Sequence, residues 1–388
     1  MTTFLHTADW QLGKPFARVD DVNKRSLLQQ ERIVAIERIG AAIAAHKAAF
    51  VLVAGDLFDS PSATRATVSA ACSKIGALRV PVLVIPGNHD HGGPGSLWEQ
   101  PFFLREQEQL APNLRILLRP EPVELDDVVL FPCPLLRRQE SADPTQWLRS
   151  PEIAERFPGK TRVVLAHGST QGFGSTGDED SDADSAAAIL DLNRLPADHY
   201  DYIALGDWHG TKQVGPCAWY SGTPEPDRFP KGGDHDQGNI LAVTVGRGAA
   251  PQVERVRTGR FAWHVRDFTF ADDADVAQLA AQLHELLATR TGEDLLRLTL
   301  QGSLGLAATD QLEQLLESQQ ARLLRLKLTD HTVMAPSEEE IAALTQRATD
   351  PLIAHVAATL VARAAGTDDA ALVARVALRE LHAAAHAN

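Results

Sequence analysis

The sequence predicts an α/β protein in which mixed sheets are flanked by helices, followed by a small α/β domain and a helical C-terminal segment. Two patterns support this prediction. In the first 260 residues, short apolar runs alternate with segments of helical periodicity, as in strand–helix–strand units. From about residue 201, strand-like runs follow one another with Gly-rich turns, which predicts antiparallel strands at the end of this region.

The predicted strands of the first region are short apolar runs at residues 4–7, 50–54, 80–85, 128–131, 162–166, 202–205 and 239–245. A helix is predicted over residues 24–48, because apolar residues recur there at helical spacing: Leu28, Ile33, Ile36, Ile39 and Ile43. A second helix is predicted over residues 63–78. Residues 169–185 combine Gly, Ser and acidic residues, so we expect a solvated loop there rather than a metal-binding segment.

The chain is predicted to divide into residues 1–260, 261–336 and 337–388. The middle region has strands at 261–270, 294–301 and 323–332 and helices at 275–289 and 310–321, a βαββαβ-like order with one strand short or hidden. After Pro336, Ser337 is an N-cap followed by first-turn acids, and the remaining helical segment breaks at Gly366. This apolar segment either packs on its own domain or binds a partner.

The composition is that of a soluble globular protein, with 44% hydrophobic and 23% charged residues among 388. No stretch approaches the roughly 18 uninterrupted apolar residues of a membrane span. The N-terminus has no basic flank and reaches an acid at Asp9, so we expect no signal peptide. Three scattered cysteines argue against a disulfide framework. We therefore predict a cytoplasmic protein without a membrane association.

The net charge of −14 argues against a simple nucleic-acid-binding module, because proteins that hold nucleic acid by charge alone are usually basic. An acidic chain can still act on phosphates if bound cations invert the local field. The negative net charge is therefore compatible with a metalloenzyme that acts on phosphates.

Metal-binding residue types follow five of the predicted strands. The segments after these strands contain Asp9, then Asp56 with Asp59, then Asn88 with His89, then His167, and finally Asp207 with His209. Sites in open α/β sheets are built at the carboxyl ends of strands. One such segment alone is weak evidence, because Gly-Asp-x-x-Asp is more often a turn than a ligand. Five together predict one shared cleft.

These residue types suit a pair of divalent cations. Two such ions about 3.5–4 Å apart need several carboxylates and imidazoles and one group shared between them. The pair lowers the pKa of a water between the ions and neutralises phosphate oxygens.

Three motifs give the sequence a family resemblance: His-Thr-Ala-Asp-Trp-Gln-Leu-Gly from residue 6, Pro-Gly-Asn-His-Asp from residue 86 and Tyr-Ser-Gly-Thr-Pro-Glu from residue 220. They resemble the calcineurin-like binuclear metallophosphoesterases, and most closely the SbcD-type DNA repair exonucleases. The motifs run from residue 6 to about 229. A calcineurin-like sandwich, an α/β capping domain at 261–336 and helical docking elements at 337–388 would match that family's layout.

The resemblance implies a ligand set. One metal would be held by Asp9, Gln11, Asp56 and His209. The other would be held by Asp56 as the bridge, with Asn88, His167 and Asp207. The resemblance also implies that His89 sits over the scissile phosphate as a catalytic acid and that Asp59 orients it.

Two positions depart from the family pattern, which usually has Asp-x-His at the start and Gly-His-x-His near the end. This chain has Gln11 and Asp207 instead. Both keep an oxygen donor, and hard donors favour Mn²⁺, or Mg²⁺, over Zn²⁺. We therefore predict two divalent ions, with Mn²⁺ first. The opposite interpretation is that one site is damaged and the chain is a scaffold.

The resemblance implies a metal-dependent DNA phosphodiesterase, the exo- or endonuclease subunit of an SbcCD-like repair or defence complex. Its partners would be DNA and an SMC-like coiled-coil ATPase, with the chain as a homodimer within a heterotetramer. One alternative is a metallophosphatase acting on a small molecule or phosphoprotein. Another is a catalytically weak scaffold subunit of an SMC-like ATPase.

Basic residues after the first ligand segment are candidates for contacts with the nucleic-acid backbone: Lys14, Arg18, Lys24 and Arg25. Alternatively, these residues are ordinary solvent-exposed charges at the start of a helix. We expect His6 to be a core histidine rather than a ligand. Trp10 and Trp208 are expected to pack beneath the site rather than to stack on a base.

Overall fold

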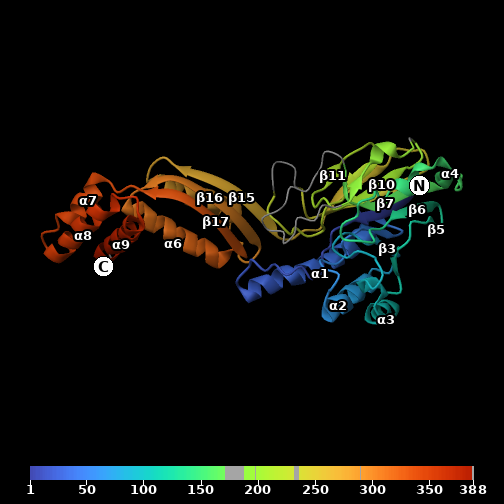
Figure 1. Cartoon of the computed structure of the whole chain (residues 1–388), viewed down its shortest axis with the longest axis horizontal. Helices are drawn as coiled ribbons and strands as arrows, with labels where there is room; N and C mark the ends of the chain where they lie inside the picture. The colour runs from blue at the N-terminus through green and yellow to red at the C-terminus, as the bar shows by residue number, and fades with distance from the viewer. Residues whose placement is uncertain (171–187, 197, 231–235, 289, 387–388) are drawn as a thin grey trace. The chain divides into compact units, whose positions relative to one another are not determined.

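A computed structural model describes residues 1–170, 188–196, 198–230, 236–288 and 290–386 of the chain. The chain forms two compact units, Met1–Ala262 and Trp263–Asn388 (Figure 1). Of the loop predicted at 169–185, only Ser169 and Thr170 are described, and they form the short strand β8. The remainder of that prediction lies outside the described residues.

Among the described residues, the first unit is built mainly on two mixed sheets. The described strands of the first sheet run in the order β14-β13-β1-β2-β3-β4, with parallel pairing from β1 to β4 and antiparallel pairing at β13 and β14. Their bounds are Gln252–Arg257 (β14), Asn239–Val245 (β13), Thr2–Thr7 (β1), Val51–Ala54 (β2), Val82–Ile85 (β3) and Leu114–Ile116 (β4). The antiparallel strands late in this unit are therefore confirmed at β13 and β14.

The second sheet has the order β11-β12-β10-β7-β6-β5, with parallel pairing in its centre. Its bounds are Lys212–Gln213 (β11), Ala218–Tyr220 (β12), Tyr202–Gly206 (β10), Thr161–His167 (β7), Val128–Cys133 (β6) and Val123–Leu125 (β5). The strands β8 (Ser169–Thr170) and β9 (Ile189–Leu190) pair separately.

The two sheets pack face to face. One buried apolar cluster takes side chains from both sheets, among them Phe4, Leu52, Leu83, Leu130, Val163 and Tyr202. Successive side chains of a strand point to opposite faces, so Val51 and Val53 of β2 lie in a different cluster, against helices. This explains why the central strands read as continuous apolar runs, because both of their faces are covered.

Helices cover the outer faces. On the first sheet these are α1 (Val22–His46), α2 (Arg65–Ala77) and α3 (Pro101–Leu110), with η1 (Leu97–Glu99) beside them. Asp21 caps α1 by accepting hydrogen bonds from the backbone N–H groups of Asn23 and Lys24. The second sheet carries η2 (Gln146–Arg149), α4 (Pro151–Glu155) and η3 (Leu192–Arg194). The sandwich of mixed sheets flanked by helices is thus confirmed, although α3 is absent from the sequence prediction.

The second unit has a described sheet in the order β15-β16-β17, with helices between its strands. Their bounds are Ala262–Phe270 (β15), Asp275–Leu287 (α5), Asp294–Leu304 (β16), Leu306–Arg322 (α6) and Arg325–Met334 (β17). Among the described residues the order is therefore βαβαβ, and the further strand of the βαββαβ-like prediction is not found in them.

Three helices complete the second unit: α7 (Glu338–Thr345), α8 (Pro351–Ala364) and α9 (Asp369–His386), in orange to red in Figure 1. Ser337 and Glu340 form a capping box at the start of α7. A buried cluster joins Leu344, Ala357 and Leu378 of these helices to Leu306 of α6. The helical segment therefore packs on its own unit. No helix among the described residues is long and apolar enough to cross a membrane.

Replacement of Leu378 by Ala tests how this segment is held. The side chain is 2% exposed, so its truncation should cost about 2–4 kcal/mol of local stability by leaving a cavity. Hydrogen exchange of α8 and α9 in the full chain should accelerate accordingly. Leu372→Ala on the same helix is the control, because Leu372 is 60% exposed. Equal acceleration in both variants would contradict the packing described.

Candidate metal centre

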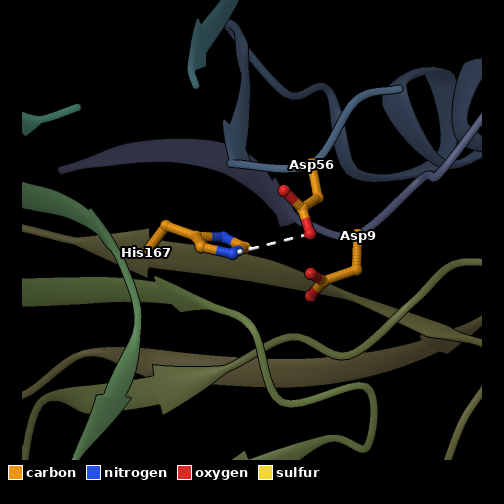
Figure 2. A group of neighbouring side chains, drawn as sticks. All are labelled: Asp9, Asp56 and His167. Atoms are coloured by element: carbon orange, nitrogen blue, oxygen red, sulfur yellow. Dashed lines mark ion pairs between the residues drawn. The ribbon is translucent and has the colours of Figure 1, made fainter. Parts of the chain in front are cut away.

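The carboxyl ends of strands from both sheets converge on one group of buried side chains. Asp9 follows β1 and Asp56 follows β2 in the first sheet, whereas His167 ends β7 in the second. One ligand atom from each of these three residues lies within 4.8 Å of the others, and all three residues are buried. Figure 2 shows both carboxylates directed toward the imidazole ring. The predicted convergence of strand ends is thus present in the fold.

His167 is the centre of this group. Its Nδ1 donates to the carbonyl oxygen of Ala54 at 2.7 Å, which leaves Nε2 facing the other side chains. Nε2 lies 2.9 Å from Asn88 Oδ1, 3.6 Å from Asp56 Oδ2 and 3.9 Å from Asp207 Oδ1. The side chains predicted for one of the two metals therefore do meet at a single imidazole nitrogen.

The electrostatics of this group favour a cation. Burial disfavours the charged imidazole of His167, but neighbouring carboxylates, Asp56 first, outweigh burial and raise its pKa to about 9. Burial also raises the pKa of Asp9 well above its usual value and raises that of Asp207. The buried carboxylates of Asp9 and Asp56 and the half-buried carboxylate of Asp207 thus share one imidazole. A donor set with this excess of negative charge fits a divalent ion with hard-ligand preference.

The backbone at the strand ends is strained to bring these side chains together. Asp9, Asp56 and Asp207 have φ values of 54°, 55° and 101°, a region that non-glycine residues rarely adopt. Two glycines allow the close approach of the ring of His167. A Cβ on Gly55 would lie 2.2 Å from His167 Nδ1, and one on Gly206 would lie 1.9 Å from the Ala54 carbonyl oxygen.

His89 is held by the main chain. Its Nδ1 donates to the carbonyl oxygen of Asp59 at 2.8 Å, and its backbone N–H donates to Asp56 Oδ1 at 2.9 Å. The resemblance implied that Asp59 orients this ring. Asp59 does so through its backbone, because its carboxylate instead lies 3.7 Å from the ammonium of Lys14.

The predicted ligands Gln11 and His209 lie together, but their donor atoms have other partners. Gln11 Oε1 accepts a hydrogen bond from Lys14 Nζ at 2.8 Å. His209 Nδ1 donates to Asp227 Oδ1 at 2.9 Å, and its Nε2 accepts from Arg228 Nη2 at 3.2 Å. Burial, reinforced by the Arg228 guanidinium, lowers the pKa of His209 to about 4. His209 Nε2 is also 3.9 Å from Asp9 Oδ1.

The basic residues proposed for nucleic-acid contacts are separated by the fold. Lys14 lies inside the centre, with its Nζ also 3.0 Å from Asp227 Oδ2. Arg18 is exposed, and Lys24 and Arg25 are half-buried in the first turn of α1. Lys14 is thus placed by site residues rather than by the start of the helix.

Sequence reasoning missed Arg32 of α1, which is 2% exposed and lies behind the ligand segment. Its guanidinium donates to the carbonyl oxygens of Trp10, Asp9 and Glu225 and to Thr223 Oγ1, at 2.8–3.0 Å. A signal was present: Arg32 follows Leu28 and precedes Ile36 at four-residue spacing, which places a cation on the apolar face of the helix.

Asp90 is a second missed residue. Its carboxylate accepts from the backbone N–H groups of Gly87 and Phe58 at 2.8 and 3.0 Å, so it ties the segment after β3 to the segment after β2. Burial, with the nearby Asp56 charge, raises its pKa to about 7. Asp227 and Arg228 were missed as well, because neither belongs to the five strand-end segments, the last of which contains Asp207 and His209.

His6 and the two tryptophans take the expected places. His6 is fully buried, accepts from Tyr202 Oη at 2.9 Å and donates to the Leu205 carbonyl oxygen at 3.1 Å. Burial lowers its pKa to about 3. Trp10 is 1% exposed and donates to Thr7 Oγ1, and Trp208 packs half-buried against the second sheet.

A protein-family model described as calcineurin-like phosphoesterase matches residues 2–211. The matched segment covers β1 through the segment after β10 and so includes the five strand ends that form the centre. Asp227, Arg228 and the second unit lie outside it.

Arg32→Met should destabilise the first unit strongly. The change removes the guanidinium donor from four buried acceptors and leaves only the Thr223 hydroxyl to donate to the carbonyl oxygen of Asp9 or Glu225, so we expect a loss of about 3 kcal/mol or more. Thermal unfolding of the full chain would measure it. Arg25→Met is the control on the same helix, because Arg25 is half-buried near the helix start. Similar melting of the two variants would show that Arg32 does not organise the ligand segment.

Proposed function

The chain belongs to the calcineurin-like phosphoesterases, and on that premise we propose that it is a metal-dependent phosphodiesterase that cleaves DNA. Membership of the family supports metal-dependent phosphoester hydrolysis. The observation on which the proposal chiefly rests is the buried group of Asp9, Asp56 and His167, with ligand atoms within 4.8 Å of one another.

The residues of this group would hold the cation. Asp9, Asp56 and Asp207 would supply carboxylate oxygens, Asn88 its carbonyl oxygen and His167 its Nε2. A divalent ion held there supplies Lewis-acid stabilisation of a phosphoryl oxygen and activates water. Mn²⁺, or Mg²⁺, suits this oxygen-rich donor set better than Zn²⁺.

His89 is the proposed general acid. Its Nδ1–H is committed to the Asp59 carbonyl oxygen, so its Nε2 is the nitrogen available to donate a proton to the leaving oxygen of the phosphodiester. The backbone contact to Asp56 ties the position of this ring to the metal ligand itself. Positioning of this kind suits a residue that acts on substrate beside a bound ion.

DNA is favoured as the substrate by the three motifs that resemble the SbcD-type exonucleases and by the presence of a second α/β unit with C-terminal helices. A metallophosphatase for a small molecule or phosphoprotein would share the metal centre but would have no evident use for that unit. A catalytically silent scaffold is disfavoured by the complete set of donors around His167.

The proposed partner is an SMC-like coiled-coil ATPase, with the chain acting in the cytoplasm as a homodimer within the assembly. Support comes from the apolar side chains that the C-terminal helices leave exposed although the segment packs on its own unit: Leu352, Val356, Leu372, Val373 and Val376. Exposed apolar side chains on adjacent helices are the kind of groups from which contact surfaces are built, where they form a contiguous patch. DNA-binding charge absent from this acidic chain would then come from the partner and the bound ions.

Incubation of the full chain with Mn²⁺ and end-labelled single- and double-stranded DNA should produce shortened fragments. Chelation should abolish the cleavage and added Mn²⁺ should restore it, because the metal is required for the chemistry. Gel electrophoresis of the products is the measurement. Hydrolysis of aryl phosphomonoesters together with intact DNA would favour the phosphatase alternative.

His89→Asn should keep the metal content and the melting temperature near those of the wild-type chain while DNA cleavage falls by about 10²–10⁴-fold. The loss should be smaller for activated aryl phosphodiesters, whose leaving groups need little protonation. His46→Asn, at the end of α1, is the matched control. Loss of the metal from His89→Asn would make His89 a ligand, and undiminished cleavage would exclude it from the mechanism.

A further inference from the structure

One half of the predicted two-metal centre is already supplied with positive charge by the chain itself. Lys14 Nζ lies 2.8 Å from Gln11 Oε1, the oxygen that was expected to bind a metal. Arg228 Nη2 lies 3.2 Å from His209 Nε2, the nitrogen expected to do the same. The two atoms that were expected to bind a metal therefore each contact a positively charged side chain of the protein.

A single buried carboxylate fixes both cations. The side chain of Asp227 is fully buried, and its Oδ2 is 3.0 Å from Lys14 Nζ. Arg228 donates to the two oxygens of Asp227 at 3.2 Å each. Burial opposes ionisation of Asp227, but Arg228 and Lys14 help to hold its pKa well below its usual value. The side chains of Lys14 and Arg228 are only 17% and 26% exposed, so these contacts are built into the site.

This half of the centre does not fit a divalent ion. An ion bound by Gln11 and His209 would have to displace an ammonium and a guanidinium from their acceptors, or lie beside both. Charges of the same sign at such short range and away from bulk water repel strongly. The half around His167 differs, because there three carboxylates converge on one imidazole.

We propose that the centre binds one divalent ion, at Asp9, Asp56, Asn88, His167 and Asp207, and that Lys14 and Arg228 take the place of the second. Gln11 and His209 are then acceptors for protein cations rather than metal ligands. The inference rests on the metal site of the proposed function but not on DNA as its substrate.

The replacement has a consequence for substrate binding. Lys14 is linked to the general acid through Asp59, whose carboxylate faces Lys14 while its carbonyl oxygen accepts from His89. Lys14 therefore places a positive charge near the position where His89 would meet a phosphate, and Arg228 adds a second charge on the other side of Asp227. That charge persists when the metal is removed, so inorganic phosphate should still bind the metal-free chain.

Counting bound Mn²⁺ in the full chain tests the inference without a measurement of activity. Titration calorimetry of chelator-treated wild-type chain, with metal analysis after gel filtration, should give one ion per chain. Electron paramagnetic resonance should show an isolated ion without spin coupling. Two tightly bound ions with a spin-coupled spectrum would overturn the inference, and so would no bound ion.

Lys14→Met combined with Arg228→Met tests the cause. Removing both charges should allow a second Mn²⁺ to bind about tenfold or more tightly than it does in the wild-type chain. The matched control is Lys160→Met with Arg247→Met, which removes one lysine and one arginine that pair with Glu124 and Asp201 elsewhere in the same unit. If only one ion binds both wild type and the double variant, Lys14 and Arg228 are not what excludes the second, and the inference fails.

The two proposals can fail separately. A chain that binds one ion and cleaves no DNA would contradict the proposed substrate and leave the single-ion centre in place. Cleavage of DNA by a chain that holds two ions would contradict the single-ion centre and leave the proposed substrate in place. If the double variant does not fold, the ion count of the wild-type chain still decides, together with phosphate binding to the metal-free chain, which the inference requires to persist.

Discussion

The hydrogen bond from His167 to the Ala54 carbonyl oxygen joins the two sheets at the edge where the chemistry is located. His167 ends a strand of the second sheet and Ala54 ends a strand of the first, so this 2.7 Å contact sets the distance between their carboxyl ends. It also fixes which ring nitrogen faces the carboxylates. Gly55 and Gly206 leave room for it, because a Cβ at either position would collide with the ring or the carbonyl group. The arrangement of Asp9, Asp56 and Asn88 around Nε2 follows from this one contact.

Charge is balanced differently in the two halves of the centre. Around His167, buried carboxylates exceed the cations of the chain, and a bound ion would relieve the excess. Around Asp227, one carboxylate meets an ammonium and a guanidinium, so that half needs no external cation. A buried carboxylate that has lost its partners is costly, whereas a paired and hydrogen-bonded one is tolerated. Asp227 thus holds Lys14 and Arg228 beside Gln11 and His209. Their charge makes a metal ion unnecessary in that half of the centre.

The apolar patterns of the sequence predicted buried, mostly parallel strands and the meeting of their ends, whereas the packing of two mixed sheets was implied by the family resemblance. Apolar runs identify buried parallel strands, and parallel neighbours bring their following segments to one edge. The features of the site that could not be predicted depend on contacts between residues far apart in the chain or on backbone atoms. Arg228 contacts His209 from a segment that has no strand-end motif, and Asp59 orients His89 through a backbone atom, which residue type does not encode. The helix α3 was missed because it is short and half polar, with one fully buried residue, Phe103. In the second unit the five predicted elements occur in the predicted order, and only the additional short or hidden strand is not found among the described residues, because the number of strands in a sheet depends on pairing rather than on periodicity.

The departure at Gln11 is best understood together with Lys14, since both belong to one turn. The backbone N–H of Lys14 donates to the Gln11 carbonyl oxygen at 3.2 Å, and Gln11 and Gly13 have φ values of 41° and 88°. This turn brings the lysine side chain back over the glutamine, so the ammonium reaches the amide oxygen three residues earlier in the chain. A neutral amide oxygen accepts a hydrogen bond from an ammonium well, whereas an imidazole committed to a metal would offer it no acceptor. On the proposal of a single ion, the amide at Gln11 and the fixed cation at Lys14 therefore form one local arrangement. A site that had merely decayed would not be expected to place a cation in this way, nor to hold it with a fully buried carboxylate from the other end of the domain.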